Sequence, residues 1–205
     1  MTTPTAPPQL APDLEYGLKR LKLKRIRELA PEPLPLAKTQ RWAPEELLHT
    51  LVEAQIQARD KANLKARTRA AGFPQEKQLE HFKIAQSSIP QPTFDYLAEW
   101  IPARACPLMI GPADTGKSHC LIGLGHATAE AGMRVRHLRA DELVELLYPG
   151  LADNTVGKVI DTPLRNDYVV VDELGFAPLD ETDSQPLFRF VAPAYKRRSV
   201  GVANH

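Results

Sequence analysis

The sequence predicts an α/β fold, in which a parallel sheet is flanked by helices, behind a helical N-terminal region. Two observations support this prediction. From residue 107 onward, short apolar runs alternate with segments of helical periodicity, which is typical of a parallel sheet covered on both faces. Between residues 13 and 72, the apolar residues recur at near-helical spacing and predict helices.

Charge is unevenly distributed along the 205 residues. Residues 1–72 contain 13 Lys and Arg and 8 Asp and Glu, a net charge of +5, whereas residues 73–205 contain 13 and 17, a net charge of −4. Together with the start of the chain, where residues 1–12 hold four prolines and no charge, this asymmetry predicts three parts. They are a disordered proline-rich tail at 1–12, a basic helical region for DNA or partner binding at 13–72, and an enzyme core at 73–205.

The N-terminal region is predicted to contain two helices. Residues 13–29 form a basic amphipathic pattern, with six Lys or Arg between the apolar positions. Residues 31–37, PEPLPLA, are expected to break the helix, and a long helix from Pro44 to about Ala71 is expected to end at Gly72. The cations either neutralise DNA phosphates or form the solvated face of a packed helix, and the sequence favours neither alternative.

Composition and cysteine usage predict a cytoplasmic protein without membrane contact. No apolar run approaches the roughly 18 residues that span a bilayer. The N-terminus lacks the basic segment and apolar stretch of a signal peptide. Cys106 and Cys120 form no CxxC pair and are interpreted as free, buried thiols of a reducing compartment.

The core is predicted to contain four strands, each separated from the next by helical segments. Strands are expected at 107–110, 133–138, 168–171 and 199–203, and helices at 119–131, 141–147, 156–165 and 182–196.

The first of these strands leads into a phosphate-binding motif. Residues 111–118, GPADTGKS, match GxxxxGK[ST] at every fixed position, between a predicted strand and a predicted helix. The backbone amides of such a loop surround a phosphate, and the helix directs its positive end at the anion. Lys117 is expected to contact the β- and γ-phosphates of ATP, and Ser118 to ligate Mg²⁺. The predicted nucleotide-binding residues are Gly111, Pro112, Ala113, Asp114, Thr115, Gly116, Lys117, Ser118 and His119.

Two carboxylates, Asp172 and Glu173, follow the apolar strand at 168–171. Open α/β sheets bind their ligands at the carboxyl ends of the strands. Asp172 is expected to hold Mg²⁺ through water, and Glu173 to polarise the attacking water as a general base. Because the pair supplies a base that activates water, it favours an ATP hydrolase over a nucleotide kinase or a GTPase.

Several segments are similar to those of one known family. The most specific is DELGFAPLD at 172–180, accompanied by GKSH at 116–119, RAAGFP at 69–74, GMRVR at 132–136, ADEL at 140–143 and YKRRS at 195–199. With these segments, the chain resembles the IstB-like helper ATPases of insertion-sequence transposition, which belong to the AAA+ class of P-loop ATPases. The resemblance extends from about Leu18 to the last residue.

The resemblance implies a P-loop AAA+ core that assembles into a homo-oligomer on duplex DNA and recruits a transposase. It also implies a catalytic role for Asn204, which would sense the γ-phosphate and help to orient the water, with His205 as a less favoured occupant of that role. Helicase loaders of the DnaC type share much of the pattern, so a replicative helicase is an alternative partner. A third hypothesis is that the protein is a remnant that binds nucleotide or DNA without turnover.

The sequence departs from the family pattern at two places. Asp114 stands where family members have a small or glycine-like residue, and its charge would oppose a phosphate by ~1–4 kcal/mol at about 4 Å unless it points outward or meets a cation. The sequence also stops at His205, before the fifth core strand, the arginine supplied to a neighbouring subunit and the helical lid of the family. We therefore expect a C-terminally truncated product that retains ATP binding and is impaired in hydrolysis and assembly.

Overall fold

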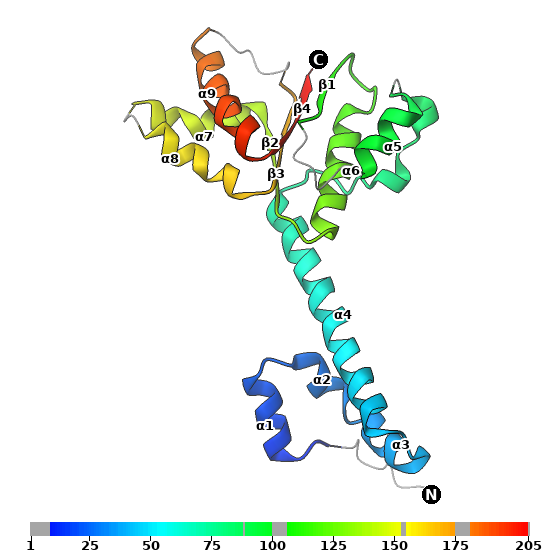
Figure 1. Cartoon of the computed structure of the whole chain (residues 1–205). Coiled ribbons are helices and arrows are strands. Elements are labelled where there is room, and N and C mark those ends of the chain that lie inside the picture. The colour runs from blue at the N-terminus through cyan, green and yellow to red at the C-terminus, as the bar shows by residue number, and fades with distance from the viewer. Residues whose placement is uncertain (1–8, 88, 100–105, 153–154, 175–180, 205) are drawn as a thin grey trace, which may run out of the picture. The chain divides into compact units, whose positions relative to one another are not determined.

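The computed structural model describes residues 9–87, 89–99, 106–152, 155–174 and 181–204 (Figure 1). Contacts divide the chain into two compact units, Met1–Asn63 and Leu64–His205. Within the described residues, none of the helices has the length and apolar character that crossing a membrane requires.

The first unit consists of helices. They are α1 (Pro12–Arg20), α2 (Lys24–Leu29), α3 (Pro33–Gln40) and the first part of α4 (Pro44–Ala71). Ile26, Ala30 and Ala37 are buried between them. The side-chain oxygen of Gln55, on α4, accepts hydrogen bonds from the backbone amides of Arg25 (3.0 Å) and Ile26 (3.3 Å). Gln55 therefore satisfies amides in the first turn of α2 that have no partner within their own helix.

Two predictions for this unit are wrong. The single helix expected at 13–29 is two helices, because the chain turns at 21–23, where Lys22 adopts a left-handed φ of 57°. The break expected at 31–37 is wrong in its extent, because α2 does end at Leu29 but the chain is helical again from Pro33, where α3 begins. Pro33 occupies the first position of α3 and Pro35 its first turn, where an amide hydrogen has no intrahelical acceptor and its loss costs nothing.

The predicted long helix and its end are confirmed by α4 and Gly72. Gly72 has a φ of 73°, a left-handed conformation that glycine adopts without a steric penalty. The chain therefore leaves the helix at Gly72, and Phe73 follows at once.

The second unit contains a four-stranded parallel sheet. Its strands are β1 (Leu108–Ile110), β2 (Val135–Arg139), β3 (Tyr168–Asp172) and β4 (Ser199–Asn204), in the order β1-β4-β3-β2. All four predicted strands are confirmed. The register pairs Ile110 with Asn204 and Arg139 with Asp172. All four strands therefore end at the same edge of the sheet.

Helices cover both faces of this sheet, and β3 is buried throughout its length. Val169 and Val171 face α7 (Ala140–Ala152), α8 (Val156–Asp161) and α9 (Glu181–Arg197). Tyr168 and Val170 face α6 (Lys117–Glu130). This alternation follows from the period of two along a strand. It places Asp172, which continues the even-numbered series, on the same side of the sheet as α6.

A segment for which the sequence predicts no element covers α6. It comprises two 3-10 turns, Leu79–His81 and Ile84–Gln86, and α5 (Gln91–Glu99). Leu79, Phe82 and Phe94 are half-buried against the apolar cluster that α6 forms with the sheet. Phe82 stacks on Phe94 with ring centroids 5.1 Å apart. Figure 1 shows α5 and α6 on one side of the sheet and α7, α8 and α9 on the other.

Both cysteines carry free thiols. Cys120, on α6, is fully buried, and burial raises the pKa of its thiol to about 12. Cys106 is only half-buried, so the prediction of a buried thiol holds for Cys120 and only in part for Cys106.

Gly201 gives a test of the packing between β4 and β3. A Cβ added at this position would overlap the Tyr168 hydroxyl and lie 3.0 Å from a Leu121 methyl. We expect Gly201→Ala to lower the free energy of unfolding by about 1–3 kcal/mol, because a well-packed core cannot absorb the added volume without strain. Urea denaturation measures this loss.

Gly157→Ala is the matched control, because nothing lies within 4 Å of a Cβ added to this exposed residue of α8. We expect its stability to be unchanged or slightly higher. An equal loss in both variants would contradict the described packing around Gly201.

Candidate functional site

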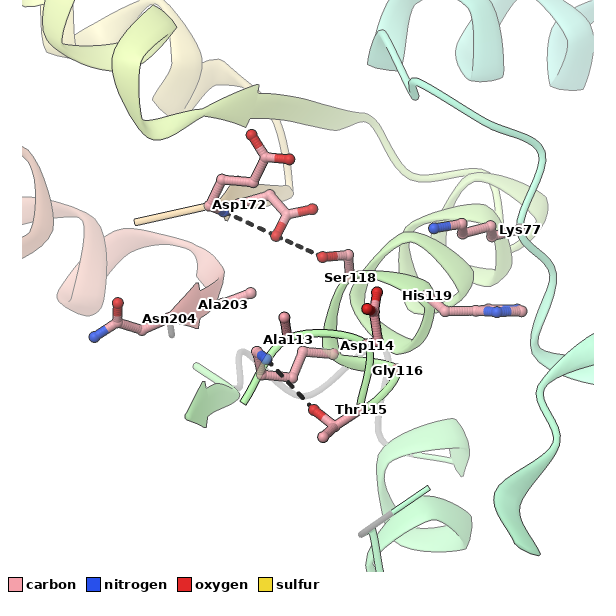
Figure 2. Close-up of a pocket in the computed structure, with 12 residues that line it drawn as sticks. Lys77, Ala113, Asp114, Thr115, Gly116, Ser118, His119, Asp172, Ala203 and Asn204 are labelled. Atoms are coloured by element: carbon pink, nitrogen blue, oxygen red, sulfur yellow. Dashed lines mark hydrogen bonds between the residues drawn. The ribbon is translucent and has the colours of Figure 1, made fainter. Parts of the chain in front are cut away.

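A cavity of about 450 Å³ opens at the carboxyl ends of β3 and β4 (Figure 2). Its lining comes from the loop after β1, the first turn of α6, the ends of β3 and β4, and the segment before the first 3-10 turn. The lining residues are Lys77, Ala113, Asp114, Thr115, Gly116, Lys117, Ser118, His119, Asp172, Glu173, Ala203 and Asn204. Residues predicted from three separate stretches of the sequence therefore share one cavity.

The loop at 111–116 requires glycine at its end. Gly116 has a φ of 91°, and a Cβ there would lie 2.8 Å from Cε2 of Phe82. Any other residue would be strained and would displace the Phe82 ring. The glycine thus allows the chain to turn directly into α6, whose first-turn amides lack intrahelical partners and carry the positive end of the helix dipole.

Lys117 keeps its ammonium group inside this loop. Its Nζ donates to the carbonyl oxygens of Gly111 (2.7 Å) and Pro112, and it lies 3.4 Å from Oγ1 of Thr115. Gly111 and Pro112 do not line the cavity and instead contribute these carbonyl groups. The positive charge of Lys117 is thereby fixed at the loop.

Ser118 and Asp172 meet across the cavity. The Ser118 hydroxyl donates to Oδ1 of Asp172 at 2.8 Å, and the Glu173 amide donates to the same oxygen at 2.9 Å (Figure 2). Oδ2 of Asp172 faces Nε2 of His137 at 3.6 Å.

Asp172 is buried, with 5% of the surface of the residue exposed. Burial by itself raises the pKa of Asp172, but the neighbouring donors outweigh burial and hold the pKa below its ordinary value. Asp172 is therefore present as a carboxylate. A hydroxyl and a carboxylate at this separation are the oxygen donors that Mg²⁺ prefers, so the pair fits that ion.

Glu173 points toward the end of β2. Its carboxylate forms an ion pair with Arg139 at 3.3 Å, and Arg139 also pairs with Asp141 at 2.7 Å. Glu173 has a φ of 60°, a left-handed conformation that is uncommon outside glycine. The backbone thus turns at Glu173 directly after β3, and the side chain leaves the strand half-exposed at the rim of the cavity.

Asp114 also has a left-handed backbone, with a φ of 60°. This conformation explains why a glycine-like residue suits the position, and Asp is among the few others that tolerate it. The side chain is exposed at the cavity, and no ion pair to it is found within the described part of the chain. Contact with a cation, one of the two arrangements considered for this acid, is thus not observed there.

The remaining site residues have different surroundings. Asn204 ends β4 and lines the cavity, and its backbone oxygen accepts the Gly111 amide at 3.4 Å. The His119 ring points away from Ser118 (Figure 2), and its Nε2 lies 3.1 Å from the carbonyl oxygen of Gln78. His205 and residues 175–180 of the DELGFAPLD segment lie outside the described residues.

Three residues near the site were not assigned a role from the sequence. Lys77 lines the cavity, Arg139 holds Glu173, and His137 faces Asp172. Arg139 and His137 reach the site because β2 lies beside β3 with Arg139 opposite Asp172. The linear sequence carries no pattern that reveals this lateral register.

Comparison with known proteins gives one family and a set of relatives. The family of IstB-like ATP binding proteins matches residues 17–204. A protein of Sinorhizobium fredii described as an insertion-sequence ATP-binding protein is 26% identical over 89% of this chain. The ATP-binding protein described for insertion sequence IS21 of Pseudomonas aeruginosa is 24% identical over 92% of this chain. The chain spans 63% of the length of the first relative and 72% of the second.

Solved structures agree with the fold. The replication initiator DnaA, bound to AMPPCP and single-stranded DNA, aligns with 64% of this chain and 42% of its own at 19% identity, with a TM-score of 0.53. Domain III of DnaA from Thermotoga maritima aligns with 64% of this chain and 57% of its own at 16% identity, with a TM-score of 0.51. At these identities the likeness concerns the fold, and it confirms the predicted parallel sheet flanked by helices.

Proposed function

Because the chain belongs to the family of IstB-like ATP-binding proteins, we propose that its cavity binds ATP with Mg²⁺ and that the protein assists insertion-sequence transposition. The observation that carries this proposal is the contact between Ser118 and Asp172 beside the loop at 111–116. The names of the relatives, which are insertion-sequence ATP-binding proteins, support the same conclusion.

The loop and the start of α6 supply the groups that hold an anion. Backbone amides at a helix N-terminus point at the ligand, and the helix dipole favours negative charge there. Lys117 adds a full positive charge, which its contacts with the loop carbonyls keep in place. To contact phosphate oxygens, the Lys117 ammonium would exchange its hydrogen bonds to the loop carbonyls for hydrogen bonds to the ligand.

Ser118 and Asp172 would hold Mg²⁺ beside the phosphates. When bound, the ion supplies neutralisation of the negative charge that builds up on phosphate oxygens during transfer. The backbone amide of Glu173 donates a hydrogen bond to the Asp172 carboxylate and holds it in place. The pair is thus ordered in advance, which lowers the entropy lost on binding.

Glu173 is the proposed general base for hydrolysis. It is the second acid after the apolar run of β3, and its carboxylate lies at the rim of the cavity, where it can accept a proton from water. The ion pair with Arg139 orients the carboxylate toward β2. We propose that Asn204, at the end of the neighbouring strand, helps to orient the water.

The proposed DNA contact lies in the first unit. Exposed cations gather where α1 ends and α2 begins, at Lys19, Arg20, Lys22, Lys24 and Arg25. Among the described residues, an ion pair is found there only for Lys24, with Glu28 at 3.6 Å. The other cations are therefore available to neutralise phosphates of duplex DNA.

The proposed protein partners are a transposase and further copies of this chain. A pull-down with the transposase, with a replicative helicase in parallel, tests the first of these. Capture of the transposase alone is expected, and capture of the helicase alone would favour a helicase loader. ATP binding without turnover, with or without duplex DNA, would favour a remnant that hydrolyses nothing.

Lys117→Ala should weaken ATP binding strongly. It removes the charge fixed in the loop, and a hydrogen bond to a charged group is worth ~1.5–3 kcal/mol, or about 10- to 150-fold in affinity. Isothermal titration calorimetry measures the loss. Lys83→Ala removes the same side chain from an exposed position outside the cavity and should bind as the wild type does. Unchanged affinity in Lys117→Ala would contradict the assigned site.

Glu173→Gln should keep ATP binding and lose turnover. The amide retains the size of the side chain but cannot accept the proton of water, and such a loss costs about 10²- to 10⁴-fold in rate. A phosphate-release assay measures the rate. Glu145→Gln, the same change on the exposed side of α7, is the control. Wild-type turnover by Glu173→Gln would place the base elsewhere.

Asp114→Gly should tighten ATP binding, because it removes a negative charge from the cavity and suits the left-handed backbone. Asp114→Asn separates these two causes, since it removes the charge and keeps a side chain that tolerates the conformation. We expect both variants to bind ATP more tightly in a titration. Weaker binding by both would show that the acid has a useful partner in the complex.

The triple variant Arg20→Glu, Lys22→Glu and Arg25→Glu should weaken duplex binding in fluorescence anisotropy. The slope of log K against log salt should fall in magnitude by about 0.9 for each phosphate that the protein no longer neutralises. A variant with the same change of charge in the second unit, at Lys158, Arg165 and Arg189, is the control. An equal effect of both variants would mean that net charge, and not the junction of α1 and α2, governs binding.

A further inference from the structure

Three rings form a row behind the Asp172 carboxylate. Phe73 stacks on His126 with ring centroids 4.3 Å apart and meets His137 edge-on at 6.4 Å. Nε2 of His137 lies 3.6 Å from Oδ2 of Asp172. The row thus leads from the segment that follows α4, through β2, to the end of β3.

His137 is an unusual occupant of a buried strand position. Its side chain is 4% exposed, and Nε2 has no hydrogen-bond partner within the part of the chain that the structure describes. A buried polar group without a partner costs ~1–3 kcal/mol. An apolar residue would avoid that cost, so the position of the imidazole calls for an explanation beyond packing.

The explanation lies in how the Asp172 carboxylate is surrounded. Oδ1 already accepts from the Ser118 hydroxyl and the Glu173 amide. Oδ2, in contrast, faces the His137 ring. At 3.6 Å the two atoms are too far apart for a full hydrogen bond, but in the tautomer with hydrogen on Nε2 the N–H still attracts Oδ2. This attraction favours one rotation of the carboxylate and thereby selects how its oxygens are presented to a cation.

We propose that His137 is a positioning residue, which orients Asp172 for Mg²⁺, and that Phe73 holds the His137 ring in this role. The inference rests on the proposed function, because Asp172 matters as a metal ligand only if the cavity takes a metal with its nucleotide. It goes beyond that function by assigning a role to two residues that do not line the cavity.

The sequence around Phe73 is suited to holding its ring. Gly72 ends α4 with a φ of 73°, so the chain turns toward α6 at once. On α6, a Cβ at Gly125 would lie 2.7 Å from Cε1 of Phe73. The absence of a side chain at Gly125 thus leaves the space that the Phe73 ring fills beside His126.

This packing gives the metal site a mechanical connection to the end of α4. If the 72–74 segment shifts, Phe73 leaves the edge of the His137 ring, and the imidazole gains room to rotate away from Asp172. The affinity of the site for Mg²⁺ would then fall, while the loop at 111–116 would keep its own contacts. Binding of Mg²⁺ would in turn favour the docked segment, because such coupling is reciprocal.

The test separates metal binding from nucleotide binding in the full chain. The affinity for a ribose-labelled fluorescent ATP is measured in EDTA and again in Mg²⁺, and the ratio gives the enhancement due to Mg²⁺. Mn²⁺ binding in the presence of ATP is followed separately by electron paramagnetic resonance. Melting temperatures of all variants identify those that fold.

We expect His137→Leu to bind labelled ATP in EDTA within about twofold of the wild type. Its Mg²⁺ enhancement and Mn²⁺ affinity should fall by about 10-fold, at the lower end of the range for residues that orient a metal ligand. His137→Asn keeps an N–H donor on a shorter side chain and should recover part of the loss. Recovery by Asn is the result that a purely packing role for His137 does not produce.

Phe73→Leu should reduce the Mg²⁺ enhancement in the same sense and to a smaller extent, because His137 itself remains. Phe190→Leu is its matched control, since Phe190 is fully buried in the cluster on the opposite face of the sheet. This control should lower the melting temperature and leave the enhancement unchanged.

Full Mg²⁺ enhancement in folded His137→Leu and His137→Asn, beside a normal wild type, would overturn the inference and leave the proposed function intact. Equal losses in Phe73→Leu and Phe190→Leu would overturn the role of Phe73. A wild type that binds labelled ATP equally with and without Mg²⁺ would refute the proposed metal site itself, and the inference with it.

Discussion

The hydrogen bond between Ser118 and Asp172 joins two elements that are distant in sequence, the first turn of α6 and the end of β3. It can form only if the strand before the loop and the strand before Asp172 run in the same direction and end at the same edge. Parallel pairing imposes the direction, and the period of two along β3 places Asp172 on the face that α6 covers. The cavity, the position of Lys117 and the surroundings of Asp172 all depend on this constraint.

Much of the core could be predicted because its signals are local. The apolar run at 168–171 has no polar face, and GPADTGKS contains the glycines, lysine and serine of a phosphate-binding loop at fixed spacing. Both could therefore be recognised without knowing what lies beside them. The helix boundaries of the N-terminal region were harder to predict. Pro33 and Pro35 predict a break in the helix if proline is assumed to interrupt helices at every position. They instead lie in the first turn of α3, where proline is tolerated. The break between α1 and α2 depends on the left-handed backbone conformation of Lys22, which no local sequence pattern predicts.

The surroundings of the two acids could not be predicted for a different reason. Arg139 and His137 act on Glu173 and Asp172 through the register of β2 against β3, which is a property of the folded sheet. Among the described residues of the second unit, the non-glycine residues with left-handed backbones are Asp114 and Glu173, and both line the cavity. Such conformations cost about 1–3 kcal/mol each and persist where the surrounding structure enforces them. Local strain in this unit is therefore concentrated at the proposed site.

The contrast between the two cysteines has a practical consequence. Thiol reagents react with the thiolate form, and Cys120 is both inaccessible and almost entirely protonated at neutral pH because its pKa is raised to about 12. Cys106 is half-exposed and lies two residues before β1, the strand that leads into the phosphate-binding loop. A maleimide dye or spin label added to the unmodified chain should therefore attach at a single point. That point would report on the approach to the loop without any cysteine having to be engineered in or out.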